Sequence, residues 1–121
     1  MMQPRDTYKQ NSPLRVLFIC SRNTWRGPTA EKVFAHHPRL SVRSAGTSSS
    51  AVHNVSLRDV EWAERILCME KKHQMFLIKK FGKEVTIKIQ ILDIEDHYRF
   101  MDPELVEMLE IDVSNILNGI L

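Results

Sequence analysis

Apolar runs and amphipathic segments alternate along the chain. Four short runs rich in Val, Ile and Leu are typical of strands, at residues 14–19, 40–44, 65–69 and 85–92. Segments with the spacing of amphipathic helices lie between and after them, at about 28–37, 56–63, 71–81 and 102–117. Strand–helix repetition of this kind favours a parallel sheet with right-handed crossovers and helices on both faces. The pattern therefore predicts a three-layer α/β fold with a four-stranded parallel sheet.

Capping residues mark several of the predicted helix ends. Pro28 suits the first position of a helix, Ser56 can cap the next one, and Gly82 fits the position just after a helix. Asp102, followed by proline, opens the last helix. These signals set the expected boundaries of the elements.

Two faces are predicted from the apolar spacing. The helix at 71–81 should turn Met75 and Ile78 inward, with Leu77 and Phe81 as further candidates for the same face. The strand at 85–92 alternates apolar and polar residues, with Ile87 on its apolar side, so one of its faces should be less deeply covered.

The composition is ordinary for a globular chain of one domain. The 121 residues carry a net charge of +2, and their Lys and Arg residues are scattered, which argues against nucleic acid as a partner. No apolar run approaches the ~18 residues of a membrane span. We expect a flexible N-terminal arm at 1–13 and one domain at 14–121. Two cysteines and the lack of a signal-peptide pattern favour the cytoplasm.

The stretch CSRNTWRGP, residues 20–28, joins the first strand to the first helix. Ligands of parallel sheets bind beyond the carboxyl ends of the strands, where this loop must lie. Five residues separate Cys20 from Arg26, and a tight loop before a helix directs backbone N–H groups toward an anion. Arg26 adds a guanidinium matched to two phosphate oxygens. In that field we expect a lowered pKa for Cys20, whose thiolate could attack phosphorus.

The residues around this loop resemble the low-molecular-weight protein tyrosine phosphatases, whose loop has the pattern C-x5-R-[ST]-P. The matching stretches are VLFICSRNTWRGPTAEKVF (16–34), RSAGT (43–47), AERILCME (63–70) and IEDHY (94–98). The resemblance covers most of 14–117 and is closest to a short bacterial subgroup of predicted phosphatases. It implies a flavodoxin-like phosphotyrosine phosphatase I fold and hydrolysis of aryl phosphate through a cysteinyl-phosphate intermediate.

The same resemblance implies partners and the roles of individual residues. The substrate would be a phosphotyrosine protein or a small phosphate ester, phosphate or sulfate would inhibit, and neither metal nor other cofactor is needed. Cys20 would be the nucleophile, and Asp96 the acid that protonates the leaving oxygen and then activates water. Asn23 would brace the loop, supported by Ser44. Arg26 is the third expected catalytic residue. The expected substrate-binding residues are Ser21, Arg22, Asn23, Thr24, Trp25 and Tyr98.

Some features depart from the family pattern or leave a choice open. Gly27 replaces a Ser or Thr whose hydroxyl donates to the thiolate, so we expect Cys20 to titrate higher than in such members. Arg22 replaces a common glycine, and the stretch between the second and third strands looks short. Asp93 and Asp102 compete with Asp96 for the role of acid. Trp25 and Tyr98 could line the cleft or lie at the edge of the core.

Three other functions are weighed against the phosphatase. A catalytically silent module could bind phosphate or phosphotyrosine through the same loop. An arsenate reductase would need two further cysteines, and only Cys68 is present, in a stretch typical of the core. A phosphocysteine-carrying sugar-transport domain is disfavoured by Arg26 and by SAGT. The histidines lack metal-ligand spacing; they are His36, His37, His53, His73 and His97.

Overall fold

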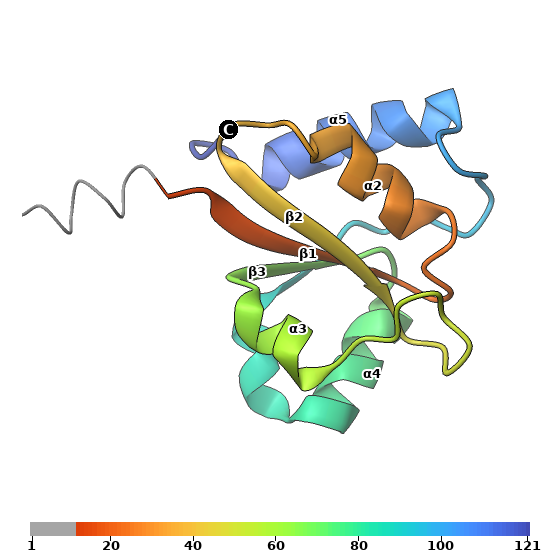
Figure 1. Ribbon diagram of the computed structural model, residues 1–121, viewed down its shortest axis with the longest axis vertical. Coiled ribbons are helices and arrows are strands. Elements are labelled where there is room, and N and C mark those ends of the chain that lie inside the picture. The colour runs from red at the N-terminus through yellow and green to blue at the C-terminus, as the bar shows by residue number, and fades with distance from the viewer. Residues whose placement is uncertain (1–11) are drawn as a thin grey trace, which may run out of the picture.

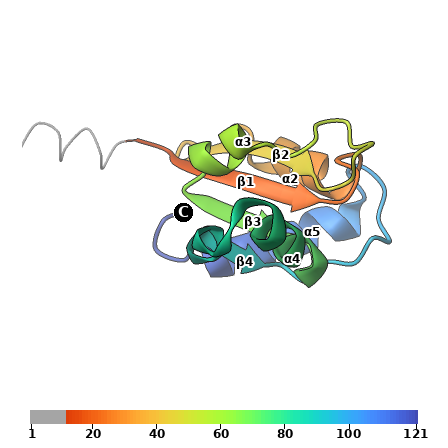
Figure 2. The same cartoon turned by 90° about the horizontal axis from the view of Figure 1, so that it is seen from below.

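The computed structural model describes residues 12–121, so the predicted arm at 1–13 lies almost wholly outside the described residues. The elements in chain order are β1 (Leu14–Cys20), α2 (Arg26–Phe34), β2 (Leu40–Gly46), α3 (Leu57–Trp62), β3 (Arg65–Cys68), α4 (Lys71–Phe81), the 3-10 helix η1 (Lys83–Lys88), β4 (Ile89–Ile91) and α5 (Pro103–Ile116). The four strands pair in parallel in the order β2-β1-β3-β4. Helices α2 and α5 cover one face of the sheet, and α3 and α4 cover the other (Figures 1 and 2). The predicted three-layer architecture is confirmed.

The central strand β1 supplies both hydrophobic cores of the molecule. Val16, Phe18 and Cys20 face the layer of α2 and α5, whereas Leu17 and Ile19 face the layer of α3 and α4. All five are at most 2% exposed. Side chains alternate along a strand, and a parallel strand covered on both faces is apolar throughout. The alternation therefore places Cys20 at the end of the α2–α5 face, where β1 leaves the sheet.

The fourth strand is shorter than the sequence pattern predicts. Residues 83–88 form η1, and only Ile89–Ile91 pair with β3. Gly82 does end α4, but its φ of 100° turns the chain directly into η1. Val85 is buried in the core between the sheet and the α3–α4 layer, while Ile87 is 90% exposed. The alternation of apolar and polar residues here therefore belongs to a helical turn. The predicted strand at 85–92 is wrong in its first half.

Helix α4 buries only part of the predicted face, including Leu77 and the partly buried Phe81. His73 and Leu77, one turn apart, are buried, whereas Met75 is 62% exposed and Ile78 only half-buried. The prediction for Met75 is wrong because apolar spacing ignored a histidine that the fold turns inward. That histidine lies beneath the functional site.

The other boundary differences are small and cluster near the first loop. Helix α2 begins at Arg26, so Pro28 stands third in it, within the first turn where a missing N–H leaves no bond unmade. Strand β2 continues to Gly46, and the carbonyl of Cys20 accepts the N–H of Thr47 at 3.0 Å. Ser56 caps α3 as predicted, accepting the N–H of Asp59. Among the described residues, none of the helices has the length and apolar character needed to cross a membrane.

Candidate active site

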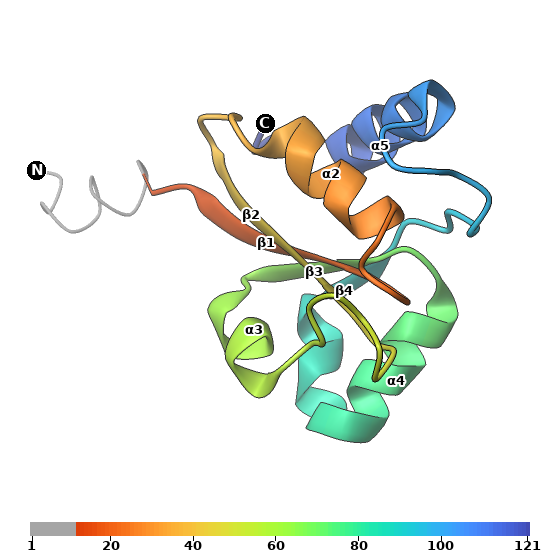
Figure 3. The same ribbon diagram turned by 45° about the vertical axis from the view of Figure 1, so that its right-hand side comes forward.

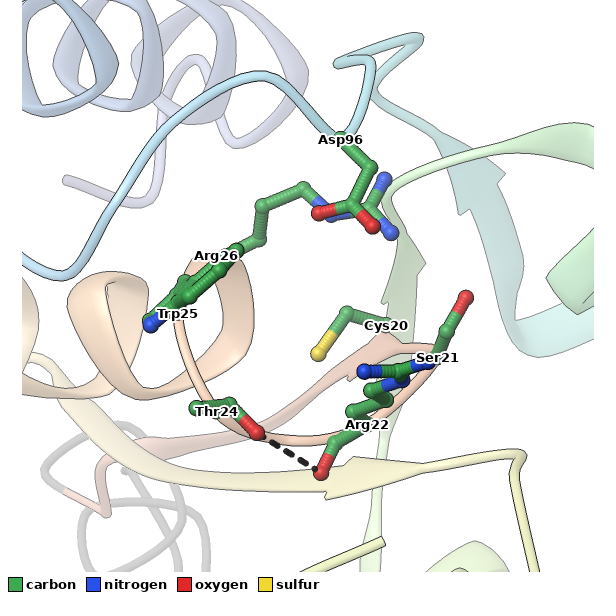
Figure 4. Close-up of a pocket in the computed structure, with 7 residues that line it drawn as sticks. All are labelled: Cys20, Ser21, Arg22, Thr24, Trp25, Arg26 and Asp96. Carbon is green, nitrogen blue, oxygen red and sulfur yellow. Dashed lines mark hydrogen bonds and ion pairs between the residues drawn. The ribbon is translucent and has the colours of Figure 1, made fainter.

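The loop after β1 and the segment that leads to α5 lie at the carboxyl edge of the sheet (Figure 3). A cavity of about 90 Å³ opens there, lined by side chains from both (Figure 4). Its lining residues are Cys20, Ser21, Arg22, Thr24, Trp25, Arg26 and Asp96. All but Asp96 come from one contiguous loop. Asp96 joins them because parallel strands end at the same edge, so the chain after β4 passes over the loop after β1.

Two of the predicted substrate-binding residues, Asn23 and Tyr98, lie outside the lining. Tyr98 packs against the core between the sheet and the α2–α5 layer, so the structure places it at the edge of the core rather than opposite Trp25. Asn23 is 6% exposed and has a φ of +56°, a conformation that asparagine tolerates better than most residues. Its Nδ2 donates to Ser44 Oγ at 2.9 Å, and Ser44 Oγ donates to Glu31 Oε1 at 2.5 Å. This chain of bonds ties the turn of the loop to β2 and α2.

The Arg26 side chain is buried, and two carboxylates and a backbone carbonyl surround its guanidinium. Its Nη1 donates to Glu70 Oε2 at 2.5 Å and to the carbonyl of Ile94 at 2.8 Å, and its Nε lies 3.6 Å from Asp96 Oδ1. Burial opposes the ionisation of Glu70, but the hydrogen bond and charge of Arg26 outweigh it and leave the pKa of Glu70 below its usual value. Arg26 is therefore a fixed cation in the lining of the cavity, beside Asp96 (Figure 4).

Sequence reasoning missed Glu70, although a signal for it was present. The residue lies two positions after the end of β3, the strand next to β1, so its side chain must emerge at the same sheet edge as the loop. An acidic residue in that position is a natural partner for an arginine of the loop. His73, one turn further along the chain in α4, was also missed, because its place at this sheet edge follows from the same position after β3.

The three candidate acids take different places. Asp96 lines the cavity with its side chain 54% exposed. Asp102 caps α5, where it accepts the N–H of Glu104 at 2.9 Å. Asp93 is exposed, has a φ of +61° and is not part of the lining. Of the three, Asp96 is the carboxylate at the mouth above Cys20.

The two cysteines are free and project to opposite faces of the sheet. Cys68 is fully buried in the core between the sheet and the α3–α4 layer, and it pairs in register with Ile19. Burial raises the pKa of its thiol to about 12. It is the core residue that the sequence predicts, and it cannot meet Cys20 without crossing the sheet. Within residues 12–121, no cluster of three or more His, Cys, Asp or Glu side chains is arranged to hold a metal.

Comparison with known proteins now bears on this arrangement. No protein-family model matches the chain. A protein-arginine-phosphatase of Geobacillus stearothermophilus is 25% identical over an alignment of 104 residues that covers 64% of this chain and 70% of the relative. The tyrosine phosphatase Wzb from Escherichia coli K30, solved in complex with phosphate, matches with a TM-score of 0.69 at 19% identity, covering 84% of this chain and 94% of its own. The low molecular weight protein tyrosine phosphatase SP-PTP from Streptococcus pyogenes gives 0.71 at 15% identity, covering 89% and 93%.

The chain has the low-molecular-weight phosphatase fold. The resemblance seen in the sequence is thereby confirmed at the level of the fold, and the matches include both tyrosine and arginine phosphatases. We call residues 20–26 the phosphatase loop from here on.

Burial raises the pKa of the Cys20 thiol above its usual value. The N–H groups of Gly27 and Asn23 and the charge of Arg26 act in the opposite direction, and the carboxylate of Asp96 acts with burial. The predicted lowering of the Cys20 pKa is therefore wrong for the free protein. The reason is that the sulfur sits at the end of a core strand, 2% exposed, where desolvation outweighs the neighbouring donors.

Gly27 has no hydroxyl to donate to the Cys20 sulfur, and neither of the two hydroxyls in the phosphatase loop, those of Ser21 and Thr24, takes over this bond. Ser21 Oγ pairs with His73 Nε2 at 3.0 Å, and Thr24 Oγ1 donates to the carbonyl of Arg22 at 3.4 Å (Figure 4). The hydrogen bonds that favour the Cys20 thiolate come from backbone N–H groups. The thiolate thus lacks a side-chain hydroxyl donor in this loop.

A serine at position 27 should lower the pKa of Cys20. A Cβ added to Gly27 would lie 3.2 Å from Cys20 Sγ and 3.2 Å from Ser44 Cβ, so its hydroxyl would be within reach of the sulfur once the neighbours give by a few tenths of an ångström. A hydrogen bond to a charged group contributes about 1.5–3 kcal/mol, equivalent to about one to two pKa units. We expect Gly27→Ser to show that shift in the pH dependence of inactivation by iodoacetamide.

The matched control for this substitution is Gly27→Ala, which adds the Cβ without the hydroxyl. It should leave the pKa of Cys20 at or above the wild-type value, because a methyl group only removes water from the sulfur. Equal shifts in the two variants would show that the hydroxyl is not the cause.

Proposed function

We propose that this protein is a phosphomonoesterase that hydrolyses aryl phosphates, phosphotyrosine above all, through a cysteinyl-phosphate intermediate. The observation that carries the proposal is the cavity that places Cys20, the anchored cation Arg26 and the carboxylate of Asp96 around one small space. The phosphatase fold supports it independently. In this proposal residues 14–121 form one catalytic domain, placed in the cytoplasm, where a cysteine nucleophile stays reduced.

The chemistry would proceed in two displacements. In the first, Cys20 Sγ attacks phosphorus, the bond from phosphorus to the leaving oxygen breaks, and Asp96 gives that oxygen its proton. In the second, Asp96 takes a proton from water, the water oxygen bonds to phosphorus, and the thiolate departs. Arg26 and the backbone amides of the loop hold the three phosphate oxygens throughout. Because burial raises the pKa of free Cys20, the thiol proton would pass to an oxygen of the incoming phosphate dianion, which leaves the thiolate to attack.

Two substrate classes are favoured by different observations. Trp25 is 41% exposed beside the cavity and offers a flat apolar face for a phosphotyrosine ring. The curated relative is a protein-arginine-phosphatase, which favours phosphoarginine as the second candidate. Asp96 and the hydroxyl of Thr24 could accept hydrogen bonds from its guanidinium. Arg22 adds an exposed positive charge at the mouth in either case.

The test is phosphate release from p-nitrophenyl phosphate and from two peptides of one sequence, one carrying phosphotyrosine and the other phosphoarginine. We expect turnover of the aryl phosphate and faster hydrolysis of the phosphotyrosine peptide, with competitive inhibition by phosphate or sulfate. Trp25→Ala should lower kcat/KM several-fold for the phosphotyrosine peptide and less for the other, because an aromatic contact contributes about 0.5–1.5 kcal/mol.

Each other outcome identifies a different function. Faster hydrolysis of the phosphoarginine peptide would make the protein an arginine phosphatase. Phosphate binding without any turnover would leave the silent phosphate-binding module, and the phosphomonoesterase proposal would be wrong.

A further inference from the structure

His73 is a buried polar residue that the proposed reaction does not use. It is the third residue of α4, 1% exposed, and lies behind the phosphatase loop. The backbone N–H of Glu70 donates to its Nδ1 at 3.0 Å. In a neutral imidazole whose Nδ1 accepts, the proton is on Nε2. His73 Nε2 therefore donates to Ser21 Oγ, 3.0 Å away.

The surroundings of His73 keep it neutral. Burial is the main cause, and the charges of Arg26 and Lys72 act with it to lower the pKa of His73 to about 4. The carboxylates of Glu70 and Asp96 act in the opposite direction and do not outweigh them. At neutral pH the imidazole is thus a fixed dipolar donor, and the orientation of its N–H follows from the helix cap.

Ser21 is the residue that this donor holds, and it is held from two sides. Its carbonyl accepts the N–H of Ser48 at 2.9 Å, while its hydroxyl is directed away from the Cys20 sulfur (Figure 4) and pairs with His73. Ser21 directly follows Cys20, so its peptide group begins the phosphatase loop. The carbonyl of Cys20 accepts the N–H of Thr47 at 3.0 Å and so orients the peptide plane that carries the N–H of Ser21, while the carbonyl of Ser21 shares the next plane with the N–H of Arg22. The contact with His73 holds the side chain that lies between these two planes.

We propose that His73 is a positioning residue for anion binding: through the Ser21 side chain it helps to hold the first two peptides of the phosphatase loop, which carry the N–H groups of Ser21 and Arg22, in the orientation that receives phosphate. The proposal rests on the proposed function only in that the site accepts a phosphate group. An N–H donor that is already oriented costs little conformational entropy when the anion binds. A substitution that frees this donor should therefore weaken the affinity for phosphate.

The experiment measures the binding of inorganic phosphate by calorimetry, without turnover, in two variants of the same residue. His73→Asn keeps an acceptor near the place of Nδ1, and so keeps the helix cap, but has nothing that reaches Ser21. His73→Gln keeps a donor near the place of Nε2 and loses the cap. We expect His73→Asn to weaken phosphate binding about fivefold to tenfold, the effect of one hydrogen bond, and His73→Gln to stay within about twofold.

A purely structural role for His73 predicts the reverse order. If the histidine only caps α4, then His73→Gln is the damaging change, and it lowers the unfolding temperature without a specific effect on phosphate. Thermal unfolding of both variants separates the two cases. Wild-type affinity in a folded His73→Asn protein would overturn the proposal.

Ser21→Ala provides the second arm and covers the case in which neither His73 variant folds. It should weaken phosphate binding as much as His73→Asn does, and the double variant should lose no more than either single one, because both remove one contact. Wild-type affinity in Ser21→Ala, or additive losses in the double variant, would show that the contact does not position the loop.

The outcome is separable from that of the proposed function. A wild-type protein that binds phosphate and hydrolyses nothing removes the phosphomonoesterase and leaves the role of His73 open to the same measurements. A wild-type protein that turns over substrate while His73→Asn binds phosphate normally retains the enzyme and removes the positioning role. Absence of phosphate binding in the wild type overturns both.

Discussion

Cys20→Ser is expected to reduce turnover of p-nitrophenyl phosphate by at least about 10³-fold. A serine hydroxyl is a far weaker nucleophile than a thiolate, and the loop has no side-chain base to activate it: Ser21 Oγ is paired with His73, and Thr24 Oγ1 with a backbone carbonyl. Arg26 and its anchors are untouched by the change. Phosphate binding should therefore persist while hydrolysis is lost.

Cys68 supplies the matched control for this prediction. It is the other thiol of the chain, fully buried on the opposite face of the sheet and away from the cavity. Cys68→Ala should lower stability by removing a buried side chain and leave kcat within a small factor of the wild type. Equal hydrolysis by Cys20→Ser and wild type would show that the nucleophile is another group. Mass spectrometry of acid-quenched wild type should in turn show a phosphorylated peptide containing Cys20.

Asp96→Asn is expected to lower kcat about 10²- to 10⁴-fold toward phenyl phosphate, whose leaving oxygen needs a proton. The loss should be much smaller toward p-nitrophenyl phosphate, because p-nitrophenolate departs without one. Asp96 stands at the mouth of the cavity, 3.6 Å from Arg26 Nε. With its side chain 54% exposed, that ion pair contributes little to stability, so Asp96→Asn should fold like the wild type.

The neighbouring carboxylates test the assignment to Asp96. Asp102→Ala removes the cap of α5 and should cost about 1 kcal/mol in the free energy of unfolding, with little change in kcat for either substrate. Asp93→Asn should also leave the leaving-group dependence intact. A greater loss toward phenyl phosphate in folded Asp102→Ala than in Asp96→Asn would move the acid to position 102.

Local sequence determined the elements whose signals are contiguous. The apolar run of β1, the polar loop after it and the start of α2 lie within 21 residues, and their hydrophobic pattern and loop residues suffice to predict strand, anion loop and helix. The strand–helix order then implies a parallel sheet, and a parallel sheet implies that the loop lies at its carboxyl edge. For this reason the sequence places the loop of Cys20 and Arg26 at the same sheet edge as the acidic segment before the last helix, whereas the choice of Asp96 within that segment came from the family resemblance.

Sequence periodicity gave wrong predictions at two places: where a polar residue is buried on a helix face, and where a glycine ends one helix and leads into another. In α4 the buried face includes His73, so a search for apolar residues selected Met75 instead. After Gly82 the chain forms η1, and an alternation typical of a strand was only the spacing of Val85 and Ile89 around a turn. Both errors arise because periodicity identifies a face but not what the rest of the molecule places against it.

The sequence by itself determined the fold class, the loop and the residue types that its chemistry requires. Only the tertiary structure decided the state of those residues. Glu70 holds Arg26 and His73 holds Ser21 because β3 lies next to β1, a neighbourhood set by the sheet order. The raised pKa of Cys20 follows from desolvation by the core around β1, which has no counterpart in the local sequence. A motif names the donors and the nucleophile, but burial and long-range partners set their charge and orientation, because both depend on what the whole chain packs around them.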